Sequence, residues 1–430
     1  MELGEALAWL DRHDLPDRPL PDRAQGADGS SGRLLELLGD PQLSAPLVRV
    51  TGRRDTDAVA LATGGLLGSK GLSVGMLLGS HLSVLNERLS VDGEPIGDEE
   101  LAAVLSDLAA MVALLDDRRL SRADLLLAGA LRWFSDRPVD VVVLDAGEGP
   151  VASASLGAGA APTPEEPPPS WSAAIDALVG VETGSGGGGA GGGRGGPSGA
   201  PAVVTGSQER GGGPGGARSV AGVDFGCSRN ETSVGGRRLD LWTPGASYEG
   251  VWLGVHGRHQ GDNFATALAA GEAFFDRPLE DPLVREAAAR LRLPGRLEVL
   301  GHRPVVVVEV AADPAATARA TAAVDEELAA CRSRLVVVGV GRCVVPAEVL
   351  SALSPERARM VIVCPAGEPG SPPVDEVAGI ARAIGARTLE SESVAAGLRA
   401  ALGLALPDEL VLVVGPAGVI GEARVALGRR

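Results

Sequence analysis

Residues 48–58 place a short β-branched strand, a tight turn and a helix directly after one another. The strand runs into Thr51-Gly52, and the residues that follow are rich in Ala, Leu and Gly. In this order the helix N-terminus points at whatever the turn holds, which is the setting of a phosphate-binding loop. The segment therefore predicts the framework of a nucleotide-binding protein.

The same loop lacks the side chains that phosphate chemistry needs. A phosphate-binding loop uses glycines so that backbone N–H groups can surround phosphate, a lysine for the β- and γ-phosphates, and a Ser or Thr for Mg²⁺. Asp55, Thr56, Asp57 and Ala58 occupy these places, and the only lysine of the chain, Lys70, lies a helix further on. The strand, turn and helix are present, but the residues that bind phosphate and Mg²⁺ are missing.

Length and composition narrow the class of protein. A chain of 430 residues is too long for one core, so we expect two domains. The net charge of −17 argues against nucleic acid or an anionic membrane as a partner. No uncharged apolar run has the length of a membrane span, and the start of the chain lacks the basic residues of a signal peptide. We therefore expect a cytoplasmic protein.

The four cysteines give no sign of a disulfide framework or a zinc site. None of them forms a C-x-x-C pair, and their positions are scattered: Cys227, Cys331, Cys343 and Cys364.

Strands and helices alternate along most of the chain, which predicts mostly parallel α/β domains. In the first half we expect strands at 72–77 and 139–144, and helices at 34–38, 98–116 and 121–135. In the second half we expect helices at 263–275 and 282–291, then strands at 304–310, 335–340, 360–363 and 409–414. Glu309 and Asp313 stand where the first of these late strands meets its loop, so we expect both to be solvated.

Residues 157–220 are dominated by Gly, Pro, Ala and Ser. Such a tract cannot bury enough surface to offset the entropy lost on ordering, so we expect it to be disordered and dispensable for folding. We place one domain at 1–298, with this tract as an insertion, and a smaller one at 299–430.

Several short motifs, in order along the chain, resemble the Mur ligase family and in particular the dihydrofolate synthase/folylpolyglutamate synthases. The G-R-H-Q-x-x-N element is similar to 257–263, and the P-G-R-L-E hinge to 294–298. Further similar segments are 6–10, 37–42, 80–82, 86–88 and 93–96. The resemblance implies a P-loop-type α/β domain followed by a smaller Rossmann-like α/β domain. It also implies an ATP- and Mg²⁺-dependent ligase that joins glutamate to folates through an acyl phosphate.

The resemblance assigns provisional roles to individual residues. Gly52, Asn263 and Arg296 would contact the nucleotide, Asp145 would bind the metal ion, and His81 would lie on the substrate side. We assign no catalytic residue. Asn263 and its neighbours at a helix start could equally serve as helix caps.

The departures from the family pattern fall on the catalytic parts. The T-G-T-N-G-K-G-S loop appears as 51–58 without its Lys and Ser, and the metal-binding D-H and K-A-G-I segments are replaced by the Gly-rich tract. In D-G-A-H-N-P, which appears as 309–314, the His is missing.

Our preferred hypothesis is therefore a degenerate member of the family that has lost ligation and acts by binding a folate-like molecule or a protein partner. The first alternative is a divergent ligase with a rebuilt ATP site. The second is a protein that binds another anionic metabolite through Arg53 and Arg54.

Overall fold

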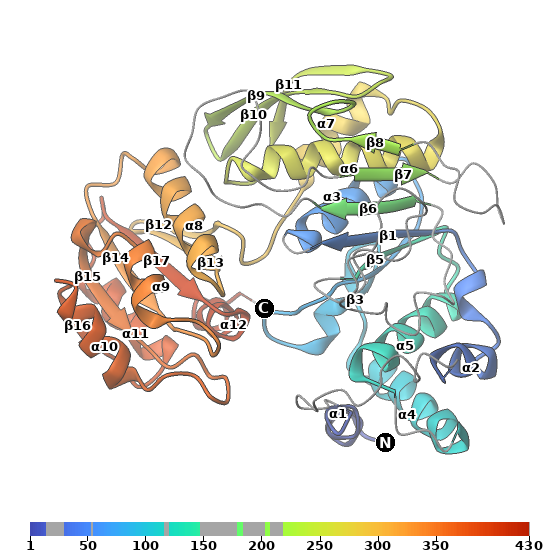
Figure 1. The fold of residues 1–430 in the computed structure, drawn as a ribbon, viewed down its shortest axis with the longest axis horizontal. Coiled ribbons are helices and arrows are strands. Elements are labelled where there is room, and N and C mark those ends of the chain that lie inside the picture. Colours follow the sequence, from blue (N-terminus) through green and yellow to red (C-terminus); the bar gives the residue numbers. More distant parts are fainter. Residues whose placement is uncertain are drawn as a thin grey trace, which may run out of the picture.

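The computed structural model describes residues 1–13, 30–52, 55–115, 120–146, 179–183, 203–206 and 218–429. An N-terminal part, blue to yellow in Figure 1, and a C-terminal part, orange to red, lie side by side. Each part is built on its own sheet with parallel central strands, and a small antiparallel sheet completes the N-terminal part. The predicted α/β class is confirmed.

The N-terminal part is built on an eight-stranded sheet with the order β4-β3-β2-β5-β1-β6-β7-β8. Strands β2, β5, β1 and β6 run parallel, and the outer strands are antiparallel to their neighbours. The bounds are β1 (Leu47–Gly52), β2 (Val74–Leu77), β3 (Leu89–Val91), β4 (Glu94–Pro95), β5 (Val141–Asp145), β6 (Val179–Thr183), β7 (Val203–Gly206) and β8 (Arg218–Val220).

Helices cover both faces of this sheet, because its central strands are apolar on both sides. Val141 and Val143 face one core while Val142 and Leu144 face the other. The first core includes α3 (Thr56–Ser69), α6 (His259–Phe275) and α7 (Asp281–Arg290). The second includes α1 (Leu3–Asp11), α2 (Ser30–Leu37), α4 (Asp98–Leu115) and α5 (Arg122–Asp136).

A three-stranded antiparallel sheet packs on the first core, with the order β11-β10-β9. Its strands are β9 (Gly226–Ser233), β10 (Gly236–Trp242) and β11 (Ser247–Leu253). Sequence reasoning did not predict it. Leu239 and Leu241 do alternate with polar residues, as expected for a sheet with one buried face, and this pattern could have indicated the sheet.

The C-terminal part has a six-stranded sheet with the order β12-β13-β17-β14-β15-β16, parallel except for β12. Its strands are β12 (Glu298–His302), β13 (Val305–Val310), β14 (Arg334–Val338), β15 (Ala358–Val363), β16 (Thr388–Glu390) and β17 (Leu410–Gly415). Its helices are α8 (Pro314–Glu327), α9 (Pro346–Ala352), α10 (Val374–Ala383), α11 (Val394–Leu404) and α12 (Ala417–Ala426). Helices α8, α9 and α10 pack on one face, and α11 and α12 on the other.

The predicted strands and helices outside the Gly-rich tract match observed elements, with small shifts at their ends. The domain boundary at residue 298 stays a prediction. Within the described residues, no helix combines the length and the apolar character needed to cross a membrane.

The prediction of disorder over 157–220 is wrong for three segments of the tract, which form β6, β7 and β8. Strand β6 pairs with β1 over five residues, and Val181 is fully buried in the first core. Composition concealed these strands because each is short and lies within a tract rich in Gly, Pro, Ala and Ser. The rest of the tract lies outside the described residues.

Because β6, β7 and β8 lie in the tract, deletion of 157–220 should affect the stability of the fold. Removing 157–220 takes away the partner of β1 and a buried valine, so we expect the folded state to be lost. Replacing only 184–202 by a short Gly-Ser turn should shift the melting temperature by no more than a few degrees, because loop-closure entropy changes slowly with length. Circular dichroism during heating measures both variants. Cooperative melting of the 157–220 deletion near the temperature of the full chain would contradict this assignment.

Candidate functional site

The carboxyl ends of three neighbouring parallel strands place several predicted site residues along one edge of the eight-stranded sheet. Val50 of β1 pairs with Asp145 of β5, and Leu77 of β2 pairs with Leu144. The loop into α3, the loop that contains His81, and Asp145 therefore start from the same edge. In open α/β sheets this edge is where ligands ordinarily bind.

Asp145 is buried, and its Oδ2 accepts a hydrogen bond of 3.0 Å from the backbone N–H of Gly79. The carboxylate therefore links the ends of β5 and β2. Within the residues that the structure describes, no group of three His, Cys, Asp or Glu side chains could hold a metal ion. The role of Asp145 as a metal ligand stays a prediction.

Gly52 ends β1 and is buried, and Arg53 and Arg54 lie outside the described residues. The chain resumes at Asp55, whose backbone is left-handed, with φ of 57°. Glycine is the usual residue in that conformation. Asp55 therefore has a backbone conformation typical of a glycine-rich loop but adds a charged side chain. The neighbouring Thr51 donates its hydroxyl hydrogen to the carbonyl of Val181 at 3.1 Å. That hydroxyl thus holds β6.

Asp57, in the first turn of α3, forms an ion pair with Arg296 of the segment that joins the two parts of the chain. Its Oδ2 accepts hydrogen bonds from Nε of Arg296 at 3.0 Å and from Nη2 at 2.8 Å. Both side chains are about one-fifth exposed. This fork on one carboxylate oxygen joins residues 239 positions apart in the sequence.

The segment that carries Arg296 is fixed against the end of β13. The N–H of Val310 donates to the carbonyl of Gly295 at 2.7 Å, and Nη1 of Arg296 donates to the carbonyl of Val310 at 3.2 Å. Gly295 has φ of +71°, and a Cβ there would lie 3.1–3.2 Å from the side chains of Val310, Ile420 and Leu82. Only glycine fits this position without a shift of its neighbours.

Glu309 lies in β13 and is buried, so the prediction of a solvated loop carboxylate is wrong. Its Oε2 accepts the backbone N–H of Leu297 at 2.5 Å. Burial raises the pKa of Glu309 to about 7, against the opposing effects of Arg296 and of this hydrogen bond. The carboxyl group is therefore partly protonated near neutral pH. The run of valines on its N-terminal side marks a buried strand and could have indicated this burial.

Asp313 was predicted to be a solvated loop carboxylate; it is half-buried just before helix α8 and caps that helix. Its Oδ1 accepts the backbone N–H of Ala316 at 2.7 Å. An Asp followed by Pro at the first helical position is a familiar helix start, and could have been recognised from the sequence.

His259 and Asn263 both belong to α6, which starts at His259. Because the N-cap position is Arg258, Asn263 lies in the second turn and does not cap the helix. Its Nδ2 donates to Oε1 of Gln260 at 3.0 Å. Burial lowers the pKa of His259, with Asp55 opposing and Arg319 and Arg296 reinforcing that shift. Burial thus favours the neutral imidazole. The nucleotide contact of Asn263 stays a prediction.

His81 is half-buried in the loop after β2. Burial and Arg88 lower the pKa of this imidazole, and Glu87 opposes them. The following residues are tied to Glu87, whose carboxylate accepts the N–H groups of Leu82 at 2.7 Å and Ser83 at 3.1 Å. Leu82 in turn packs against the C-terminal part. The loop of His81 is thus ordered by contacts on both sides, and its substrate-side role stays a prediction.

We call Asp55, Asp57, His259, Arg296 and Glu309 the hinge cluster. The charges of Asp57, Glu309 and Asp55 act on Arg296 and raise its pKa although burial alone would lower it. Arg296 therefore keeps its charge. Sequence reasoning singled out Arg296 through the hinge motif, but it did not predict the partner of this arginine.

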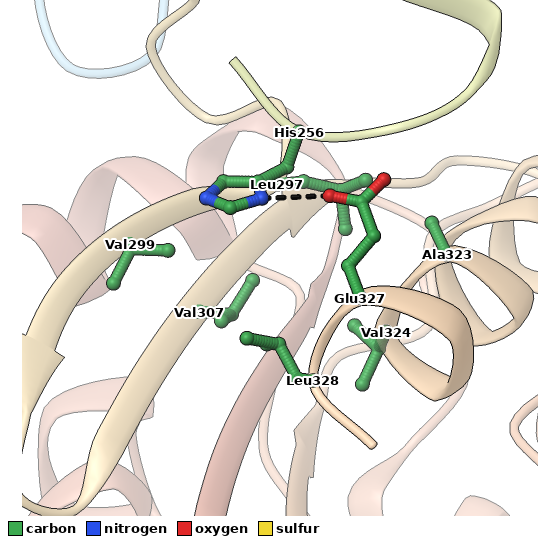
Figure 2. A pocket seen from close by; sticks show the side chains of 8 residues that line it. All are labelled: His256, Leu297, Val299, Val307, Ala323, Val324, Glu327 and Leu328. Atoms are coloured by element: carbon green, nitrogen blue, oxygen red, sulfur yellow. Dashed lines mark hydrogen bonds and ion pairs between the residues drawn. The ribbon is translucent and has the colours of Figure 1, made fainter. Parts of the chain in front are cut away.

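A second junction between the two parts is centred on Glu327, at the end of α8. Its Oε2 lies 2.7 Å from Nδ1 of His256, and its Oε1 accepts the N–H of Gly257 at 2.8 Å and pairs with the buried Arg237. Figure 2 shows His256 and Glu327 meeting above the apolar side chains of a small cavity. Its volume of about 10 Å³ suits one water and no organic ligand. Sequence reasoning missed this junction.

The comparison with protein families identifies residues 295–417 as a Mur ligase glutamate ligase domain. A dihydrofolate synthase/folylpolyglutamate synthase of Mycobacterium tuberculosis is 30% identical over 313 residues, 66% of this chain and 63% of that protein. A probable bifunctional folylpolyglutamate synthase/dihydropteroate synthase of Haloferax volcanii is 27% identical over 423 residues, 92% of this chain and 48% of that protein. The chain thus spans less than two thirds of the length of both relatives.

Structural likeness covers the whole chain. The folylpolyglutamate synthase of M. tuberculosis in complex with ADP superposes with a TM-score of 0.76 at 24% identity, over 100% of this chain and 98% of that one. At this identity the likeness shows the fold, which is the Mur-ligase-like α/β fold that the sequence motifs predict. The chain therefore has the Mur-ligase-like fold of the folylpolyglutamate synthases, and its sequence is similar to that of the M. tuberculosis dihydrofolate synthase/folylpolyglutamate synthase.

Proposed function

We propose that this chain no longer ligates glutamate and that it acts by binding, with a folate-like anion or a protein partner as its ligand. The ion pair between Asp57 and Arg296 carries the proposal. The carboxylate of Asp57 binds the guanidinium of Arg296, which the family resemblance assigns to contact with the nucleotide. The comparisons support a fold shared with the folylpolyglutamate synthases.

The chemistry of ligation explains why this pair matters. Formation of an acyl phosphate requires positive charge on the transferring γ-phosphoryl group, usually supplied by Mg²⁺ and a lysine. The loop 51–58 contains no lysine. Each lost charge-assisted hydrogen bond is worth roughly 1.5–3 kcal/mol, and each carboxylate beside a triphosphate costs about 1–4 kcal/mol. Together these losses remove most of a micromolar affinity, which is about 8 kcal/mol.

A divergent but active folate ligase is the second candidate. The sequence similarity to the M. tuberculosis protein and the structural likeness to its ADP complex favour it. For this activity a nucleotide phosphate would have to displace Asp57 from Arg296, and Mg²⁺ would need ligands other than those of the family loop.

Calorimetric titration with Mg-ATP separates the two candidates. We expect no saturation at micromolar ATP, because Asp55 and Asp57 repel the phosphates and no lysine attracts them. A motif-intact folylpolyglutamate synthase titrated under the same conditions serves as the positive control. A dissociation constant in the micromolar range or below for this chain would overturn the proposed loss of ligation.

A further inference from the structure

We propose that Asp57 determines the ligand specificity of the hinge cluster by acting as a built-in anion on Arg296. This inference rests on the proposed function and goes beyond it, because it names the residue that excludes phosphate-bearing ligands and the change that would readmit them.

The position of Asp57 is that of a bound anion. It lies in the first turn of α3, where the helix N-terminus favours negative charge. Its Oδ1 accepts the backbone N–H of Ala58 at 2.8 Å, while Oδ2 takes the fork from Arg296. One carboxylate thus receives both a backbone N–H of the helix start and a guanidinium, the two kinds of donor that bind phosphate oxygens elsewhere.

Contacts other than the ion pair with Asp57 keep Arg296 in place. Its Nη1 donates to the carbonyl of Val310, so the guanidinium is held by the backbone of β13 independently of Asp57. Glu309 bonds the neighbouring N–H of Leu297, which fixes the same segment. Removing the charge of Asp57 should therefore free Nε and Nη2 of Arg296 without releasing the segment that carries it.

The substitution Asp57→Asn tests this directly, with inorganic pyrophosphate as the probe and calorimetry as the measurement. Asparagine keeps the shape and can still accept the N–H of Ala58, but it no longer neutralises Arg296. We expect the variant to bind pyrophosphate at least tenfold more tightly than the unmodified chain. The double variant with Arg296→Gln should lose that gain, because the gain depends on the guanidinium.

The matched control is Asp281→Asn, which changes the net charge equally and removes the carboxylate partner of Arg285 in a surface pair on α7. We expect no gain from it. An equal gain in the control, or no gain in Asp57→Asn, would overturn the role of Asp57. In the second case weak Mg-ATP binding by the unmodified chain would leave the proposed function standing. Tight Mg-ATP binding by the unmodified chain would overturn both.

Discussion

Expression of this chain in a bacterial strain that lacks its own dihydrofolate synthase/folylpolyglutamate synthase should not restore growth without supplements. The reaction needs charge neutralisation at the γ-phosphate, and neither Thr56 nor Ala58 can replace the missing lysine and metal-ligand hydroxyl. Asp57, paired with Arg296, adds negative charge where the phosphates would lie. Since acyl-phosphate chemistry fails as a whole without these groups, we expect no colonies, and not merely slow growth.

Two controls distinguish a lack of ligase activity from a lack of folded protein. Soluble expression must be shown first, and the related M. tuberculosis enzyme, expressed from the same vector, should restore growth. A further variant replaces residues 53–58 by the family loop Thr-Asn-Gly-Lys-Gly-Ser. We expect it to fail too, because the second metal-binding segment of the family has no counterpart in the Gly-rich tract. Growth with the unmodified chain would make the divergent ligase the better explanation.

The sequence predicted most of the α/β elements because the central strands are almost entirely apolar, which is typical of strands buried on both faces. The apolar runs that became β5, β13 and β17 are buried on both faces, and few other structures accommodate such runs. The same reasoning failed for β6, which is held mainly by its pairing to β1. Its short apolar segment among glycines carries little local signal, and the partner strand lies more than a hundred residues earlier.

The functional site was predictable only in part, because its interactions join distant segments. The hinge motif singled out Arg296, but nothing local to 51–58 shows that Asp57 would reach it. Glu309 was misjudged because a carboxylate near a strand end is ordinarily solvated, whereas here the joining segment covers it and donates an N–H. Pairings between segments this far apart depend on how the two parts of the chain dock, which a single sequence does not reveal.

Replacing Glu327 by Gln should lower the stability of the assembled chain strongly, while replacing Glu326 by Gln should not. The side chains of Arg237 and Glu327 are 0% and 2% exposed, and Glu327 also bonds His256 and Gly257. Removing the charge of Glu327 leaves the buried Arg237 without its buried partner, at a cost on the order of 3–5 kcal/mol. Glu326 also lies near Arg237, at 3.2 Å, but is 48% exposed, and exposed pairs contribute about 0–1 kcal/mol.

Calorimetric melting curves of the two variants give a direct comparison, since both remove one carboxylate charge from adjacent positions near the same arginine. We expect the midpoint of Glu327→Gln to fall by roughly 10 °C and that of Glu326→Gln by no more than a few degrees. Because Arg237 belongs to β10 and Glu327 to α8, the larger effect should also loosen the junction between the two parts, visible as faster amide hydrogen exchange at 256–257. Equal midpoints for the two variants would show that Glu327 does not hold this junction, and that the remaining contacts between the two parts suffice.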